Sequence, residues 1–362
     1  MNHLFSIADQ FNFSGKVTEV QEFGNGNINQ TFLVSLDSSE AKNFILQRIN
    51  TRVFHHPELV MANMRTLSEH VGRKRKDSFL SETRRWDVPQ VLLTREAKDH
   101  FVSDGSFWRA ITFVDKARSY ETIQNTDHAR EVGWALGMFH SIICDLQPDK
   151  LFDTLEGFHI TPRYVCHYDE VAKDQALSPE EKYCVGFVDK RRGWTGVLED
   201  AKADGKIPLR PIHGDPKVNN IMMDPVSGKA VSFVDLDTVK PGLVHYDIGD
   251  CLRSGCNPLG EEVGEWESVH FDCQLCFPIL QGYLSVAGNF LTDQDYHYIY
   301  DSIRLITFEL GLRFFTDHLE GNTYFKARHP NHNLQRALVQ FKLCESIESQ
   351  ENSIQSLIKS LI

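Results

Sequence analysis

The chain has 362 residues, of which 41% are hydrophobic and 24% charged, so it should fold into a globular protein of about two domains, which excludes disordered and fibrous architectures. Its formal net charge of −12 repels phosphate groups and argues against a nucleic acid or an anionic membrane surface as partner. No basic leader or long apolar stretch is present, so we expect a cytoplasmic protein. The eight cysteines are scattered and should be reduced thiols; Cys273 and Cys276 lack the second pair that a zinc site needs.

Short alternating and β-branched runs dominate the first 115 residues and predict an antiparallel sheet. Apolar residues recur at helical spacing over Pro57–Lys76, which predicts one helix within this sheet region. The five expected strands are Lys16–Glu22, Ile28–Leu36, Asn43–Arg48, Gln90–Thr94 and Ser106–Val114.

Helical patterns dominate the rest of the chain, beginning with the amphipathic segment His128–Leu146. The other helical patterns are Pro179–Lys202, Val269–Ala287, Asp293–Leu319 and Asn333–Leu361. One β-like island, Asn220–Asp237, interrupts them. We therefore predict an α+β fold with two lobes: residues 1–115 form a small antiparallel sheet with one helix, and residues 116–362 form a larger, mainly helical lobe.

The most informative polar residues lie in two segments, His-Gly-Asp-Pro-Lys-Val-Asn-Asn at 213–220 and Val-Asp-Leu-Asp at 234–237. Two strand-like runs between them are joined by a turn that contains Pro and Gly, which predicts a hairpin. That hairpin brings Asn220 and Asp235 to the same open end, near Asp215. Phosphoryl transfer needs such oxygen ligands for magnesium and a separate carboxylate to accept a proton, so we predict Asp215 as the base. Turn and capping hydrogen bonds are the alternative role of these residues.

The two segments resemble the catalytic motifs of the aminoglycoside phosphotransferase and choline kinase superfamily, over nearly the whole chain. Further segments resemble N-acetylhexosamine 1-kinases, a branch that phosphorylates the anomeric hydroxyl of N-acetylglucosamine or N-acetylgalactosamine. They are Glu22–Val34, Phe44–Asn50, Asp235–Gly242 and Gly311–Phe325.

The resemblance implies a protein-kinase-like bilobal fold, ATP and Mg²⁺ as cofactors, and a small sugar as acceptor. It implies that Asp215 is the catalytic base, that Asn220 and Asp235 hold magnesium, and that His213 supports the catalytic loop. It also implies that Asp247 braces this loop from a following segment.

The nucleotide is expected to bind mainly to the small lobe. Gly24-Asn25-Gly26-Asn27 lies between the first two predicted strands, where a kinase glycine loop covers the triphosphate, although an ordinary hairpin would look similar.

Kinases carry a lysine on the third strand to hold the phosphates, whereas this chain has Gln47, and by resemblance the N-acetylhexosamine kinases share that loss. Arg48 must face the opposite side of the strand. Lys217 is either the missing cation or a solvated loop lysine. The connector Phe113-Val114-Asp115 resembles a kinase hinge, whose backbone would hydrogen-bond adenine.

For the acceptor, Arg313 lies in an apolar helical run, where an unpaired arginine is costly to bury, so it needs a partner or a ligand. By resemblance this segment lines the sugar pocket, which makes Arg313 and Tyr324 acceptor-binding candidates together with Asp215. An internal salt bridge for Arg313 and simple packing of Tyr324 are the alternatives. Asn27 stands where the resembling enzymes are expected to carry histidine, so the preferred hexosamine stays open.

Two other hypotheses compete with a sugar kinase. A choline, ethanolamine or aminoglycoside kinase needs an acidic or aromatic cage for its cationic acceptor. The residues that offer such a cage are Glu261, Glu262, Glu265, Trp266 and Glu267, whose dense charge favours a solvated surface loop. A pseudokinase would explain the missing lysine, but the catalytic residues are complete.

Overall fold

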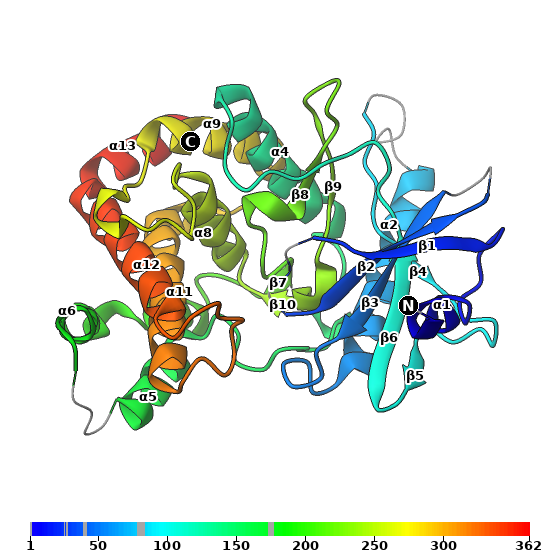
Figure 1. Ribbon diagram of the computed structural model, residues 1–362. Helices are drawn as coiled ribbons and strands as arrows, with labels where there is room; N and C mark the ends of the chain where they lie inside the picture. The colour runs from blue at the N-terminus through cyan, green and yellow to red at the C-terminus, as the bar shows by residue number, and fades with distance from the viewer. Residues whose placement is uncertain (1, 25, 27, 39–41, 78–83, 173–176) are drawn as a thin grey trace.

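The computed structural model describes residues 2–24, 26, 28–38, 42–77, 84–172 and 177–362. A small part built on an antiparallel sheet lies beside a larger, mainly helical part, as Figure 1 shows. The predicted α+β fold is confirmed.

The sheet of the small part has six strands among the described residues, in the order β1-β2-β3-β6-β4, with β5 paired to β6. Its strands are β1 (Val17–Glu22), β2 (Gln30–Leu36), β3 (Asn43–Ile49), β4 (Val91–Leu92), β5 (Phe101–Ser103) and β6 (Ser106–Thr112). The five predicted strands are present, although β4 is shorter than expected. The sequence pattern misses β5, whose hairpin with β6 turns through Asp104 and Gly105 at φ of 49° and 70°. An Asp-Gly pair is a hairpin signal that could have revealed it.

Different helices cover the two faces of this sheet. α1 (Asn2–Ala8), which the sequence pattern does not predict, packs on the face that carries Phe44 of β3. α2 (Pro57–Asp77) matches its prediction and packs on the opposite face, against Ile49. Because successive side chains of a strand point to opposite faces, Gln47 lies on the α2 face.

The larger part is built from helices and two short pairs of strands. The helices are α4 (Thr126–Ile143), α5 (Thr161–Val171), α6 (Pro179–Asp189), α7 (Val197–Ala203), α8 (Val244–Gly255), α9 (Cys273–Ala287), α10 (Asp293–His297), α11 (Ile299–Leu319), α12 (His332–Ser349) and α13 (Glu351–Leu361). None of the helices in the described segments is long and apolar enough to cross a membrane.

The helix predictions for the large part differ from the structure in five places. The single helices expected over Asp293–Leu319 and Asn333–Leu361 are each divided in two, into α10 and α11 and into α12 and α13. The single helix expected over Pro179–Lys202 is broken into α6 and α7 by residues 190–196, which include Gly193 and Gly196. Helix α5 escapes prediction because only two of its residues, Thr161 and Tyr168, are buried. Helix α8 is not predicted either, and it buries charged side chains together with its apolar ones.

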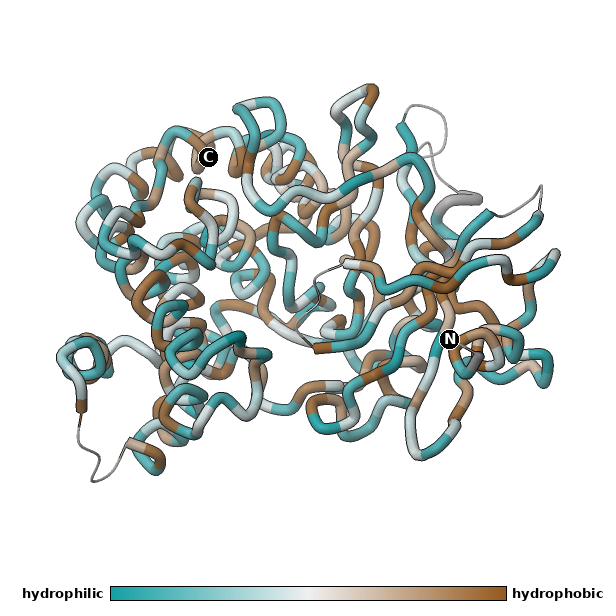
Figure 2. Tube along the Cα trace, viewed as in Figure 1, coloured by the Kyte–Doolittle hydropathy of each residue, from teal (hydrophilic) through white to brown (hydrophobic). Residues whose placement is uncertain are grey.

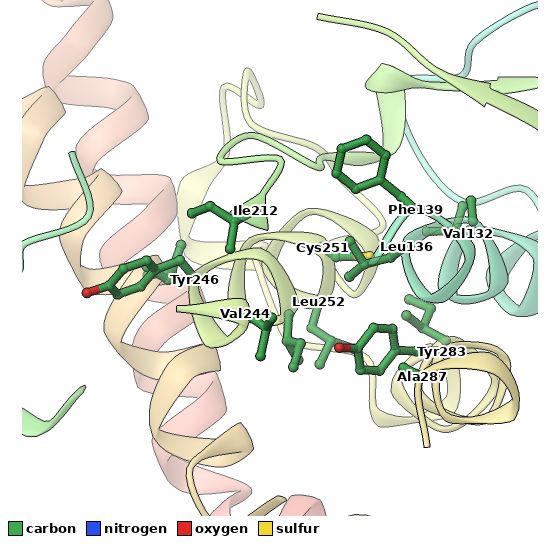
Figure 3. Packing of buried hydrophobic residues seen from close by; sticks show 14 of the residues in the cluster. Val132, Leu136, Phe139, Ile212, Val244, Tyr246, Cys251, Leu252, Tyr283 and Ala287 are labelled. Carbon is green, nitrogen blue, oxygen red and sulfur yellow. The ribbon is translucent and has the colours of Figure 1, made fainter. Parts of the chain in front are cut away.

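The core of the larger part lies where α4, α8 and α9 meet. Figure 3 shows Leu136 and Phe139 of α4, Leu252 of α8 and Tyr283 of α9 gathered around this junction. In Figure 2 the strands of the small part and the helices of the large part both carry hydrophobic segments, and the loops between them are more hydrophilic.

Helices α4 and α9 approach each other so closely that particular positions at their contact have no room for a side chain. A Cβ atom on Gly133 of α4 would lie 1.8 Å from the carbonyl oxygen of Ile279. A Cβ atom on Gly282 of α9 would lie 2.0 Å from the carbonyl oxygen of Arg130. Real Cβ atoms do not approach oxygen so closely, so both positions require glycine. This crossing fixes α4 against α9 beneath the loop that follows β7 (Arg210–Ile212).

Candidate active site

The two polar segments identified in the sequence meet through a hairpin and a second strand pair. After β7, the chain forms a short turn of 3₁₀ helix over Val218–Asn220 and then the predicted hairpin of β8 (Ile221–Met223) and β9 (Ala230–Phe233). The backbone oxygen of Asn220 accepts a hydrogen bond from the nitrogen of Val234, 2.9 Å away. Asn220 therefore lies opposite Val234, the residue that follows β9 and directly precedes Asp235.

Asp235 adopts a left-handed backbone with φ of 60°, which aspartate tolerates better than most residues. The chain then makes one 3₁₀ turn over Leu236–Thr238, and β10 (Lys240–Gly242) returns antiparallel to β7. The strained turn brings the carboxylate-bearing segment back beside the loop that follows β7.

Asp215 is half-buried and has two polar neighbours within its own loop. Lys217 Nζ lies 2.9 Å from Asp215 Oδ2. Asn220 Nδ2 donates to the backbone oxygen of Asp215 at 2.7 Å and to Oδ2 at 3.1 Å. Burial opposes the charge of Asp215, but the ion pair with Lys217 outweighs it and lowers the pKa of the carboxyl. Asp215 is therefore ionised at neutral pH and able to accept a proton.

The oxygen atoms of Asn220 and Asp235 suit a hard divalent cation. The amide nitrogen of Asn220 is committed to Asp215, and no described residue donates to its side-chain oxygen. Asp235 is exposed, and repulsion by the nearby carboxylates of Asp237 and Asp215 raises the pKa of its carboxyl. Two protein oxygens in a region of excess negative charge fit Mg²⁺, which keeps several waters and takes its other ligands from phosphate.

Asp247 of α8 holds the backbone of the loop that follows β7, residues 213–220, in place. Its two carboxylate oxygens accept hydrogen bonds from the nitrogen of His213 at 2.7 Å and from that of Gly214 at 2.8 Å. His140 Nε2 lies 2.8 Å from the same carboxylate, which is fully buried. The backbone oxygen of His213 accepts from the hydroxyl of Thr238 at 2.8 Å. Asp247 therefore supports this loop, as the family resemblance implies.

The ring of His213 supports the same loop. Its Nε2 donates to the backbone oxygen of Val234 at 3.1 Å, and its Nδ1 accepts from the nitrogen of Asp215 at 3.2 Å. Burial lowers the pKa of His213, so the ring is neutral, as these two opposite hydrogen-bond roles require. His213 therefore ties the loop to the end of β9.

A second buried histidine reaches the loop from the other side. His159 Nε2 lies 2.7 Å from the backbone oxygen of Gly214, and its Nδ1 lies 2.9 Å from Glu309 Oε1. Thr161 donates to the other oxygen of Glu309 at 2.7 Å. Burial opposes a charge on His159, but Glu309 outweighs it and raises the pKa of the ring. Sequence patterns miss this pair because His159 and Glu309 lie 150 residues apart.

The small part contacts this site through Asp237. Arg109 of β6 forms an ion pair with Asp237, whose Oδ1 lies 2.5 Å from the guanidinium, and both side chains are 1% exposed. Asn29, at the end of the glycine-rich segment, donates from Nδ2 to Asp237 Oδ2 at 2.6 Å. The sequence reasoning names neither Arg109 nor Asn29 as a site residue. A charged residue within the apolar run of β6 is the signal that could have identified Arg109.

Of the predicted nucleotide-binding residues, Gly24 and Gly26 lie between β1 and β2, Gln47 lies on the central strand β3, and the connector 113–115 follows β6. Gly24 has a positive φ of 77°, while Asn25 and Asn27 lie outside the described residues. Phe113 of the connector packs edge-on against Phe23, with ring centroids 6.0 Å apart.

In that connector, Val114 is buried and the backbone oxygen of Asp115 accepts from Arg85 at 2.7 Å. Phe23, which precedes the glycine-rich segment, thus contacts the connector.

A cavity of about 830 Å³ opens between the glycine-rich segment and the loop that joins α11 to α12. Its wall includes Gly26 and Asn29 from the small part and residues 321–330, among them Tyr324, from the large part. Asp317 of α11 holds this loop because its carboxylate accepts the backbone nitrogens of residues 323–325 at 2.7–3.0 Å. The sequence reasoning does not identify Asp317.

Arg313 lies one helical turn before Asp317 and is surrounded by aromatic rings. The centroids of Phe158, Tyr164, Phe325 and Tyr324 lie 4.9, 5.2, 5.3 and 5.8 Å from its guanidinium carbon. No carboxylate of the described residues forms an ion pair with it, so the alternative role in an internal salt bridge finds no partner among them. Burial opposes its charge, but Tyr164, Tyr324, Glu309 and Asp215 outweigh burial and raise the pKa of Arg313.

The acidic cluster at 261–267 is only partly the solvated loop that its composition suggests. Glu261 is half-buried and forms an ion pair of 2.6 Å with Arg253 of α8. Glu262 pairs with Arg336 of α12 and, at 3.3 Å, with Arg328. The prediction is wrong for Glu261, because the buried Arg253 neutralises it, whereas Glu262 is exposed as predicted although it is paired.

The eight cysteines are free thiols, as expected. Within the described ranges no group of three or more His, Cys, Asp or Glu side chains is placed to hold a metal.

Comparison with known proteins identifies related sequences and folds. The model of the phosphotransferase enzyme family matches residues 19–266. A microcompartment-associated aminopropanol kinase is similar over 98% of each chain, with 16% identity and a TM-score of 0.64. An aminoglycoside phosphotransferase from Alicyclobacillus acidocaldarius covers 98% of this chain and 96% of its own, with 13% identity and a TM-score of 0.61. Choline kinase from Cryptosporidium parvum covers 99% of both chains, also with 13% identity and a TM-score of 0.61. These likenesses are in the fold.

Proposed function

The chain belongs to the phosphotransferase enzyme family, and from that premise we propose that it transfers the γ-phosphoryl group of ATP to the anomeric hydroxyl of an N-acetylhexosamine. In this proposal residues 1–115 form the nucleotide-binding lobe, and residues 116–362 form the lobe that carries the catalytic loop and the acceptor site. ATP binds along the glycine-rich segment and the Phe113–Asp115 connector.

Asp215 acts as the general base. It accepts the proton of the anomeric hydroxyl, the sugar oxygen attacks the γ-phosphorus in line, and ADP leaves. The lowered pKa of Asp215 keeps it ionised. Its hydrogen bond from Asn220 and the support from His213 fix its direction, so positioning contributes alongside proton transfer.

Asn220 and Asp235 would hold Mg²⁺ through their side-chain oxygens. The ion would supply neutralisation of the charge on the β- and γ-phosphates. Lys217, beside Asp215, adds a positive charge on the acceptor side of the γ-phosphate.

The observation that carries the choice of a sugar is the environment of Arg313. A guanidinium surrounded by four aromatic rings and unpaired with carboxylates of the described residues repels a cationic acceptor. It can donate to hydroxyl and acetamido oxygens, and Tyr324 beside it offers an aromatic surface to a sugar ring. The segment 311–325 also resembles the acceptor segment of N-acetylhexosamine 1-kinases.

The second candidate is a kinase for an amino alcohol or an aminoglycoside, since the similar structures include an aminopropanol kinase and a choline kinase. Such an acceptor needs free carboxylates, yet Glu261 and Glu262 are paired with arginines. A pseudokinase is disfavoured because Asp215, Asn220 and Asp235 are all present around one site.

The proposal is tested by ADP release from ATP and Mg²⁺ with N-acetylglucosamine, N-acetylgalactosamine, N-acetylmannosamine, glucose, galactose, choline and kanamycin. Phosphorus NMR of the product should show a sugar 1-phosphate from an acetamido sugar. Turnover with choline or kanamycin alone would establish the second candidate. ATP binding without turnover of any acceptor would favour a pseudokinase.

Arg313→Gln tests the acceptor assignment directly. The KM for the sugar should rise about 10-fold, because a charge-assisted hydrogen bond is lost, while ATP affinity stays unchanged. Arg304→Gln is the matched control, since Arg304 lies on the same helix over the rings of Trp194 and Tyr300. Equal effects of both variants on the sugar KM would contradict the role of Arg313.

A further inference from the structure

A row of polar side chains crosses three neighbouring strands of the small part at one register position. Thr31 of β2 pairs with Gln47 of β3, and Gln47 pairs with Arg109 of β6. Gln47 Nε2 donates to the hydroxyl of Thr31 at 3.0 Å. The side-chain oxygen of Gln47 accepts from Arg109 Nε at 2.9 Å and from an Nη atom at 2.7 Å. Gln47 therefore fixes the plane of the Arg109 guanidinium.

This guanidinium points out of the sheet toward the catalytic residues. It lies on the α2 face, where Met64 Sδ is 3.0 Å from one Nη atom. Its ion pair with Asp237 reaches the segment that carries Asp235, two residues earlier in the chain. Arg109 is thus a fully buried cation at the border between the sheet and the proposed metal site.

Stability alone is a weak reason for such an arrangement. Taking two charges out of water costs about as much as their attraction returns, and apolar residues of similar volume often serve as well. Arg109 is embedded in an apolar strand between Trp108 and Ala110, where an apolar side chain would fit the pattern. Binding of an anionic ligand explains a fixed arginine at this position, whereas packing does not.

We propose that Arg109 is the phosphate-holding cation that β3 lacks, moved by one strand at the same register and oriented by Gln47. When ATP binds, the guanidinium exchanges part of its contact with Asp237 for phosphate oxygens, which match its planar fork. This inference rests on the proposed function in one respect, the use of a nucleoside triphosphate. The proposal makes Gln47 a residue that orients Arg109, and not merely a residue that replaces the lysine of other kinases.

The first test is calorimetric titration of the full-length protein with a non-hydrolysable ATP analogue and Mg²⁺, without acceptor. Arg109→Gln should weaken binding about 10-fold or more, the effect of losing charge-assisted hydrogen bonds to phosphate. Arg48→Gln is the matched control because Arg48 is the exposed neighbour of Gln47 on the other face of β3. Its affinity should stay within about twofold of the wild type, since exposed charges are screened.

A purely structural Arg109 would also disturb the site, by leaving Asp237 buried without its cation. Asp237→Asn removes that charge, so Arg109→Gln is measured again in the Asp237→Asn background. If Arg109 holds phosphate, the second substitution weakens analogue binding in this background as well. If Arg109 only neutralises Asp237, Arg109→Gln has no effect on analogue binding in the Asp237→Asn background, and the proposal is overturned.

A relocated cation gives the complementary test. Gln47→Lys combined with Arg109→Gln returns the charge to β3 and should recover a large part of the affinity lost in Arg109→Gln. Binding no better than in Arg109→Gln, in a folded protein, counts against phosphate contact at this position. A wild-type protein that binds no ATP analogue would overturn the proposed function itself, which separates that failure from a wrong choice of residue.

Discussion

The catalytic loop and the glycine-rich segment face the same site but are held in different ways. Residues 213–220 are tied from behind by Asp247, His159 and Thr238, which are buried or half-buried in the large part. Among the described residues, one side-chain hydrogen bond, from Asn29 to Asp237, joins the glycine-rich segment to the large part. The proposed base is thus fixed in place, whereas the segment proposed to cover the nucleotide is attached at its end. Substitutions in the first region should therefore act on kcat, and those in the second on nucleotide affinity.

The largest effect should come from the base itself. Asp215→Asn removes the proton acceptor but keeps the shape of the loop, so kcat should fall by at least about 100-fold. Binding of ATP, measured by calorimetry, should persist. Asp224→Asn, in the turn between β8 and β9, is the control and should retain full activity. Near-normal kcat in Asp215→Asn would remove this residue from the base role.

Loosening the loop without touching the base should have the next largest effect. Asp247→Asn leaves a buried backbone N–H without its acceptor, which should cost roughly 1–3 kcal/mol of stability. The displaced loop should lower kcat by about 10-fold or more. Denaturant unfolding and steady-state kinetics measure the two effects.

Asp317→Asn provides the comparison for that variant. Asp317 is also a buried carboxylate that accepts hydrogen bonds from several backbone N–H groups, but it holds the loop between α11 and α12 that lines the cavity. Its loss should raise the KM for the acceptor and leave kcat nearly intact. The same kinetic change in Asp247→Asn and Asp317→Asn would contradict a specific dependence of kcat on the support that Asp247 gives to residues 213–220.

The glycine-rich segment should respond in affinity alone. Asn29→Ala removes its hydrogen bonds to Asp237 and to the nitrogen of Asn50, so the KM for ATP should rise about 5-fold. Because the catalytic loop is untouched, kcat should remain within about twofold of the wild type. Thr18→Ala, on β1 away from the site, is the control. A fall in kcat without a change in KM would contradict the division between the two regions.

The smallest effect concerns the pair His159 and Glu309. The raised pKa of His159 means that the pair stabilises the folded state fully below pH 6.5, and that this contribution is lost as pH rises through the raised pKa. Glu309→Gln should remove this dependence and lower the melting temperature at pH 6 by about 2–4 °C. Thermal unfolding between pH 5 and 9 measures it. Identical pH profiles for both proteins would show that His159 is not charged.

The sequence predicts those features that depend on neighbouring residues. The sheet, α2 and the β8–β9 hairpin follow from local alternation, helical spacing and turn chemistry. Asp215 and Asn220 share one motif, so their proximity is a local property. By contrast, the link between Arg109 and Asp237 joins residues 128 positions apart, and no pattern within one segment specifies it.

Buried charge explains most of the remaining misses. Helix α8 places Asp247, Asp250 and Arg253 inside the protein, so its sequence looks polar although the helix is buried. Arg253 is satisfied by Glu261, which the composition of its own loop assigns to solvent. A charged residue taken alone favours exposure. Its burial can therefore be predicted only when its oppositely charged partner is also known.

The contact between α4 and α9 has a consequence for how this chain can change over generations. At Gly133 and Gly282 the obstacle to a larger residue is a backbone carbonyl, which no second substitution can remove. At Gly242 the obstacle is the side chain of Ile212, whose Cδ1 atom lies 2.3 Å from the Cβ position. In a random library, second-site suppressors should therefore arise for Gly242→Ala, for instance at Ile212, and should be absent for Gly133→Ala and Gly282→Ala.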